Sequence, residues 1–249
     1  MAKENITVTL GKYVDATNNQ IYSCSNNPPE IMHLGGLQNF ERPDGYYIAE
    51  NTLYVLEYFE FDSTMSLRKG SETKRDNARI ERGFNSVPPT DEGIVLRDSL
   101  HVQQNSKNYI ENSLKNMDSH YSKIESYLAK LKDNGLMQKN VKIGFFIEDT
   151  TILGNVYSPH EWKPVEPVIL CYCKHFLDKF ENYPNLDFCI CASTYSSQSF
   201  LWFINKQSVS EFRNLEIDLK NIEILNFQPK VMGFKITVPA SNGKFLSDP

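Results

Sequence analysis

Two carboxylates in the first quarter of the chain have the spacing expected of a shared metal site. Asp44 follows Pro43 at the start of an expected hairpin strand, and Glu57 lies thirteen residues later in the apolar run LYVLEYF. A tight turn near Asn51 would bring the two side chains opposite each other, where cross-strand neighbours lie about 5 Å apart. Two carboxylates that close repel unless a cation lies between them. The pair therefore predicts a site for Mg²⁺ or Mn²⁺, hard cations that prefer oxygen ligands.

The other acids of this hairpin are expected to face differently. Strand alternation puts Glu57 on the side of Phe59 and Phe61, and it puts Glu60 and Asp62 on the opposite side. We expect Glu60 and Asp62 to meet solvent. Glu57 shares its face with two phenylalanines, and a buried carboxylate needs a partner.

With these residues, the hairpin resembles the PD-(D/E)XK nuclease superfamily, the fold of many restriction and repair nucleases. The matching features are Pro43-Asp44, the hairpin that follows, Glu57 in an apolar strand, and then a long helix (101–132) and a buried strand (141–147). The resemblance implies that Asp44 and Glu57 are catalytic and bind the metal. It implies a magnesium-dependent endonuclease, a hydrolase that cleaves phosphodiester bonds in nucleic acid, with DNA favoured over RNA.

The third motif position departs from the superfamily. Phe59 stands where a lysine usually orients the water or stabilises developing charge, and phenylalanine does neither. A basic residue from elsewhere, such as Lys69 or Lys107, could fill this role, and Lys69 is our catalytic candidate. Alternatively, the site is degenerate and the protein binds nucleic acid or another protein without cutting. The resemblance also allows Glu30, on an expected short helix upstream, to add an acid near the site, as in some members of the superfamily.

A basic stretch follows the hairpin. Residues 68–82 carry six positive and three negative charges. One interpretation is a solvated loop of mixed charge. The other is a loop or partly helical arm that contacts phosphates, which supply most of the non-specific affinity for nucleic acid. The residues predicted to bind nucleic acid are Arg68, Lys69, Lys74, Arg75, Arg79 and Arg82.

Hydrophobic patterning predicts an α/β fold with a central mixed sheet flanked by helices. Apolar residues recur at threes and fours through 101–132, which is typical of an amphipathic helix. The stretch EPVILCYCKHFLDKFENYP is expected to be mainly helical, and VKIGFFIED, LDFCICAS and SFLWFINK are expected to be strands. The short segment ITVTL alternates and predicts a further strand. Helices that alternate with apolar strands favour a sheet covered on both faces.

One domain is expected over residues 1–249. The resemblance implies a restriction-endonuclease-like core at about 28–150, interrupted by a polar excursion at 63–100. A C-terminal α/β extension would then occupy 151–249. This length is ample for one large domain.

Composition restricts the remaining functions. The net charge of −5 means that nucleic acid would have to bind to a local basic patch. The sequence has no P-loop, no dinucleotide fingerprint and no G-x-S-x-G motif, which argues against nucleotide-driven motors, oxidoreductases and serine hydrolases.

The sequence shows no signal peptide and no membrane-spanning run, so we expect a cytoplasmic protein with no membrane partner. The sequence leaves a homodimer open.

Two further groups have an ordinary and a functional interpretation. The cysteine pairs at 171/173 and 189/191 could bind zinc, but their apolar surroundings favour core packing. Glu148-Asp149 ends an expected strand, where the acids either meet solvent or line a ligand site at the carboxyl edge of the sheet.

Overall fold

The structure is a computed structural model of the chain. It describes residues 5–17, 21–23, 28–64, 66–67, 70–85, 95–100, 104–151, 156–157, 164–165, 170–195, 198–216, 226–227 and 232–237. In these ranges, no helix is long and apolar enough to cross a membrane.

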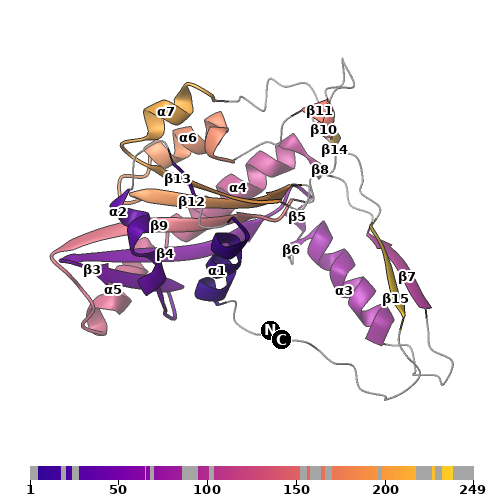
Figure 1. Ribbon diagram of the computed structural model, residues 1–249, viewed down its shortest axis with the longest axis horizontal. Coiled ribbons are helices and arrows are strands. Elements are labelled where there is room, and N and C mark those ends of the chain that lie inside the picture. Colours follow the sequence, from indigo (N-terminus) through magenta and orange to yellow (C-terminus); the bar gives the residue numbers. More distant parts are fainter. Residues whose placement is uncertain are drawn as a thin grey trace.

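A seven-stranded mixed sheet forms the centre of the molecule (Figure 1). Strands β4, β9 and β12 are parallel neighbours, and the pairs β3–β4 and β12–β13 are antiparallel. In sheet order, the strands are β1 (Tyr22–Ser23), β13 (Gln198–Asn205), β12 (Phe188–Tyr195), β9 (Asn140–Asp149), β4 (Thr52–Phe61), β3 (Gly45–Ala49) and β2 (Gln38–Asn39). The predicted central mixed sheet is confirmed, and the strands expected at LDFCICAS and SFLWFINK extend the same sheet.

Helices cover both faces of the sheet, as the patterning predicted. One face, here the α4 face, packs against α4 (Ser106–Tyr121), α5 (Ile124–Asp133), η2 (Leu170–Tyr172), α6 (Lys174–Glu181) and α7 (Val209–Arg213). The other, here the α1 face, packs against α1 (Ile6–Ala16), α2 (Pro29–Met32) and η1 (Leu34–Gly36). Each face has its own hydrophobic core, so residues of one strand alternate between two separate environments.

The strand predicted at ITVTL is wrong, because this segment begins helix α1. The Asn5 side chain accepts hydrogen bonds from the backbone N–H groups of Thr7 and Val8, which is the usual N-cap arrangement. Ile6, Leu10 and Tyr13 are the buried residues of the helix. Their spacing is helical, and the alternation over five residues was too short to identify a strand.

The single helix predicted at 101–132 is two helices. The chain leaves α4 after Tyr121, and α5 begins at Ile124. At the break, the Ser122 hydroxyl donates to the backbone carbonyl of Ser119 and the Ser126 hydroxyl to that of Lys123. Such local bonds compete with helical hydrogen bonding and explain a break that hydrophobic spacing alone did not predict.

The polar excursion contains α3 (Glu72–Asn85), which confirms the expectation of a partly helical segment. Small strand pairs accompany it: β5 (Ser66–Leu67) with β6 (Gly70–Ser71), and β7 (Val95–Leu100) with β15 (Met232–Thr237). Figure 1 shows α3 and the β7–β15 ribbon set apart from the central sheet. Two more pairs are β8 (Gln104–Asn105) with β14 (Asn226–Phe227), and β10 (Val156–Tyr157) with β11 (Pro164–Val165).

The four cysteines of the two predicted pairs lie in the core beneath α6. All are buried, and burial raises the pKa of each thiol, so they remain protonated and apolar in character. Within the described ranges, no group of three or more His, Cys, Asp or Glu side chains is arranged to hold a metal ion. The structure thus supports core packing for Cys171, Cys173, Cys189 and Cys191.

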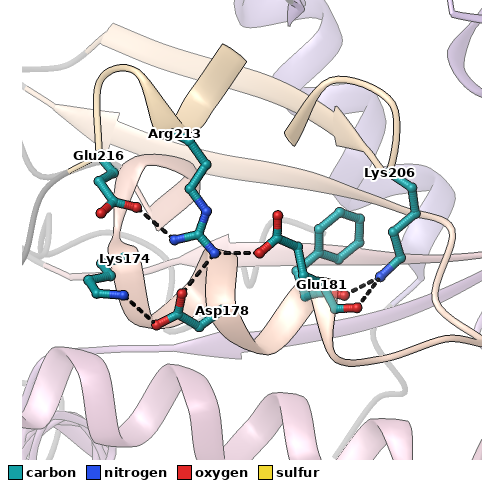
Figure 2. A network of polar contacts seen from close by, with 7 residues as sticks. Lys174, Asp178, Glu181, Lys206, Arg213 and Glu216 are labelled. Carbon is teal, nitrogen blue, oxygen red and sulfur yellow. Dashed lines mark hydrogen bonds and ion pairs between the residues drawn. The ribbon is translucent and has the colours of Figure 1, made fainter. Parts of the chain in front are cut away.

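A polar network holds α7 against α6 (Figure 2). The guanidinium of Arg213 donates at 2.5 to 2.7 Å to three carboxylates, those of Asp178, Glu181 and Glu216. Lys206 donates to the backbone carbonyl of Glu181 at 3.4 Å, at the C-terminal end of α6. These pairs are partly exposed, so each contributes little free energy. Their main effect is to orient one short helix on another.

Two glycines allow the packing of the α1 face to be tested. A Cβ on Gly144 of β9 would lie 2.2 Å from the ring of its cross-strand partner Phe188, whereas a Cβ on Gly11 of α1 meets nothing within 4 Å. We expect Gly144→Ala to lower the free energy of unfolding by about 1–3 kcal/mol. Gly11→Ala, the control, should raise it by up to about 1 kcal/mol, since alanine favours the helix. Urea denaturation measures both; an unchanged Gly144→Ala would contradict the close approach.

Candidate functional site: the Asp44–Glu57 carboxylate pair

The register of the β3–β4 hairpin brings Asp44 opposite Glu57. Gly45 pairs with Leu56 at the first rung of the ladder, so the next position outward sets residue 44 against residue 57. The Asp44 carboxylate also accepts the backbone N–H of Tyr58 at 2.9 Å, which continues the ladder through a side chain. The structure therefore brings together the two acids that the sequence singled out.

Glu57 is buried on the α4 face, on the side of Phe59 and Phe61 as predicted. Its Oε1 accepts a hydrogen bond from the hydroxyl of Tyr127 at 2.6 Å, and Nδ1 of His120 lies 2.8 Å from the same oxygen. Because a carboxylate only accepts, this nitrogen carries the proton. The second oxygen, Oε2, is also buried and receives no hydrogen bond from the residues that the structure describes.

Asp44 and Glu57 interact unfavourably when both are charged. Burial, and next the negative charge of Glu57, raise the pKa of Asp44 from 3.8 to about 6. Burial likewise raises the pKa of Tyr127, and its hydrogen bond to Glu57 adds to the effect, so the hydroxyl stays protonated as a donor. The pair thus has one oxygen fixed by protein donors and a carboxyl group next to it that resists ionisation.

Phe59, at the position of the motif lysine, packs against His120. Phe59 is buried, and its ring lies 4.8 Å from the imidazole centroid with 18° between the two planes. The stacking fixes the orientation of the ring that contacts Glu57. The sequence analysis did not identify His120 or Tyr127. Both lie more than sixty residues after Glu57, and the histidines show no metal-ligand spacing. Only the return of α4 across β4 brings residue 120 to residue 57.

Of the two lysines proposed to replace the motif lysine, the structure describes only Lys107, which does not lie at the pair. Lys69 lies outside the described residues, so its catalytic role stays a prediction. The proposal for Lys107 is wrong: it lies thirteen residues before His120 on α4, which is about 20 Å along the helix. Its ammonium is 3.8 Å from Glu111 and exposed.

The predicted phosphate-binding arm lies partly on α3, where its charges have acidic neighbours. Lys74 forms an ion pair with Glu60 at the end of β4. Arg75 lies 3.6 Å and Arg79 3.9 Å from Asp76. Arg82 donates from Nε to the backbone carbonyl of Ala78, and Arg68, like Lys69, falls outside the described part of the chain. Phosphate binding by this arm stays a prediction, and it would compete with these ion pairs.

Glu30 does not join the pair, so that expectation is wrong. It is buried on α2, and its backbone carbonyl accepts the hydroxyl of Tyr47. Tyr47 belongs to the core of the α1 face, while Glu57 belongs to the α4 face. The sheet separates the two carboxylates, because α2 packs on the side opposite to α4.

The solvated position predicted for Asp62 is wrong. Asp62 is 7% exposed, and its carboxylate accepts hydrogen bonds from the Thr64 hydroxyl at 2.6 Å and the Ser71 hydroxyl at 2.6 Å. The chain turns directly after β4 and folds back through β6, so the turn itself buries the acid. Glu60, by contrast, stays partly exposed beside Lys74.

The acids at the end of β9 are bound by tyrosines. Glu148 accepts the Tyr13 hydroxyl at 2.9 Å, and Asp149 accepts that of Tyr109 at 2.8 Å. Asp149 is 6% exposed, so solvent does not explain it, and burial raises its pKa to about 6. A ligand at this carboxyl edge stays a prediction.

Comparisons of the chain with protein-family models, with curated proteins and with solved structures found no match. The geometry of the Asp44–Glu57 pair is therefore the basis of the functional argument.

The burial of Asp44 and its repulsion by Glu57 together predict a pH-dependent gain in stability from Asp44→Asn. The unfolded carboxyl ionises near 3.8 and the folded one near 6, so wild-type stability falls as the pH rises between these values. Asp44→Asn removes the ionisable group, so the stability of the variant should not fall over this pH range. Water screens part of the repulsion because Asp44 is partly exposed, which makes the expected gain smaller. Without metal at pH 7.5, we expect a gain on the order of 1 kcal/mol, or roughly 2–4 °C in melting temperature.

The gain should shrink when the melting temperatures are compared at pH 4. Asp133→Asn removes an exposed carboxylate at the end of α5 and serves as the control, with little change at either pH. An equal gain from Asp44→Asn at both pH values would show that the unfavourable ionisation of Asp44 is not its cause.

Proposed function

We propose that the protein is a divalent-cation-dependent hydrolase that cleaves phosphodiester bonds in nucleic acid, with DNA as the favoured substrate. One observation carries the proposal: Asp44 and Glu57 converge, and when Asp44 is ionised the buried Oε2 of Glu57 has no hydrogen-bond donor among the described residues. A buried carboxylate oxygen without a donor is costly, and a bound cation would offset the cost.

The residues present fit Mg²⁺ or Mn²⁺. Asp44 and Oε2 of Glu57 would supply two hard oxygen ligands, and Mg²⁺ commonly takes one or two carboxylates with water and phosphate oxygens completing its shell. When bound, such an ion lowers the pKa of a water ligand and stabilises charge on a leaving oxygen. The raised pKa of Asp44 indicates that a second negative charge beside Glu57 is unfavourable, and a cation bound between the two carboxylates would reduce this cost.

His120 and Tyr127 would act as supports in this site. They contact Oε1 of Glu57 at 2.8 and 2.6 Å, which leaves Oε2 available as a ligand for the cation. Donors behind a ligating carboxylate fix its orientation. Phe59 contributes indirectly, because its ring stacks on His120 and limits the rotation of the imidazole.

The element order supports a restriction-endonuclease-like core. The β3–β4 hairpin carries both acids, α4 and α5 follow, and β9 then pairs in parallel with β4 over ten residues, from Thr52–Asn140 to Phe61–Asp149. This order is the one on which the resemblance to the PD-(D/E)XK superfamily was based.

A second candidate function is binding to nucleic acid or protein without cleavage. Phe59 favours it, because a buried aromatic ring occupies the position of the motif lysine. This candidate predicts no metal binding at the pair. It also predicts that the substitutions below leave binding unchanged.

The proposal is tested by comparing Asp44→Asn and Glu57→Gln with the wild type. Glu60→Gln, on the other side of the same strand, is the control. We expect wild type and control to nick supercoiled plasmid with Mg²⁺ or Mn²⁺, and the two site variants to lose at least about a hundredfold in rate. Glutamine keeps an oxygen acceptor for Tyr127, so Glu57→Gln should remain folded.

A thermal shift with Mn²⁺ gives a readout that does not depend on the substrate. The wild type and Glu60→Gln should gain stability as Mn²⁺ rises through its dissociation constant, while Asp44→Asn should not. Wild type that neither gains stability nor cleaves plasmid or RNA would favour the non-catalytic candidate instead.

A further inference from the structure

Arg42 lies at the tip of a short turn that leads directly into the carboxylate pair. The turn runs from Phe40 to Asp44, and the backbone N–H of Phe40 donates to the carbonyl of Asp44 at 2.9 Å. Arg42 is exposed, and its φ of +72° lies in the left-handed region that favours glycine. An arginine is therefore held where glycine would cost less conformational energy.

The turn is anchored on both sides of Arg42. Nζ of Lys130, on α5, donates to the backbone carbonyl of Glu41 at 2.5 Å. The ring of Phe40 packs edge-on against Tyr46 at 5.6 Å between centroids. These contacts hold the backbone in its unfavourable conformation, and non-glycine residues held in this way cluster at functional sites.

The turn that carries Arg42 lies on the α4 face of the sheet, the face on which Glu57 is buried. Lys130 of α5 contacts the turn, and Phe40 packs against the core of this face. Arg42 itself lies two residues before Asp44. Arginine stays charged at any physiological pH, and its planar fork binds phosphate oxygens in a bidentate manner. Lys130 donates to the backbone of the turn, and Arg42 is the exposed cation that the turn itself carries.

We propose that Arg42 binds a phosphate of the nucleic-acid backbone next to the bond that is cleaved, and that it supplies the positive charge which Phe59 cannot. This inference rests on the proposed function and names a substrate contact for the same site. It differs from the predicted arm on α3, where Lys74, Arg75 and Arg79 lie beside acids.

The left-handed backbone at Arg42 permits an unusually clean test. Arg42→Gly removes the charge and suits the backbone, so the melting temperature should stay equal or rise, whereas a structural role would lower it. Arg42→Lys keeps the charge but loses the fork. Lys12→Gln, an exposed cation on α1 across the sheet, is the matched control.

Binding of a fluorescent DNA duplex, measured in EDTA over a range of salt concentrations, reports the contact without catalysis. We expect Arg42→Gly to weaken binding about ten- to hundredfold. The slope of log affinity against log salt should become less steep by about 0.9, the value for one phosphate contact. Arg42→Lys should keep most of the slope, and Lys12→Gln should match the wild type.

Cleavage of the same duplex with Mg²⁺ completes the test. Loss of cleavage in Arg42→Gly, with the melting temperature maintained, supports the proposal. Wild-type binding and cleavage by Arg42→Gly, or a loss that accompanies unfolding, overturns the inference about Arg42 alone. A wild type that does not cleave overturns the proposed function, and with it the reaction that this contact would serve.

Discussion

The parallel pairing of β4 with β9 is the constraint on which the candidate site depends. Two parallel neighbours cannot be joined by a tight turn, so the chain must cross one face of the sheet between them. Here the crossover includes α4 and α5, and it returns along β4 itself. Asn112 of α4 donates to the carbonyl of Asp62, Asn116 to that of Glu60, and His120 reaches Glu57. The side chains that bind Glu57 are therefore a consequence of the topology.

The pairing of Asp44 with Glu57 was predictable because it depends on local geometry. A hairpin turn fixes its register, and alternation fixes which side chains share a face. The same reasoning correctly grouped Glu57 with Phe59 and Phe61. It failed for Asp62, since the alternation ends with the strand and the chain beyond it folds back and supplies hydroxyl donors.

Contacts between distant segments were not predictable from spacing. His120 follows Glu57 by 63 residues, and nothing in its neighbourhood distinguishes it from the other histidines. The break between α4 and α5 was likewise missed, because serine hydroxyls that bond to nearby carbonyls leave the hydrophobic period intact. Helix α1 was predicted wrongly for another reason. The five-residue alternation of ITVTL was interpreted as a strand, although Asn5 is a suitable helix cap and the apolar residues continue with helical spacing to Tyr13.

The two oxygens of Glu57 have separate consequences for how the protein can diverge. Oε1 joins a central strand to both α4 and α5, so selection for a stable fold alone would retain an acceptor at this position in a descendant that had lost all chemistry. An ionised Asp44 is unfavourable in the folded state, first because it is partly buried and next because Glu57 repels it. Among related chains, an acid at position 57 would thus report ancestry and folding, while under the proposed function an acid kept at position 44 would mark those that bind a cation.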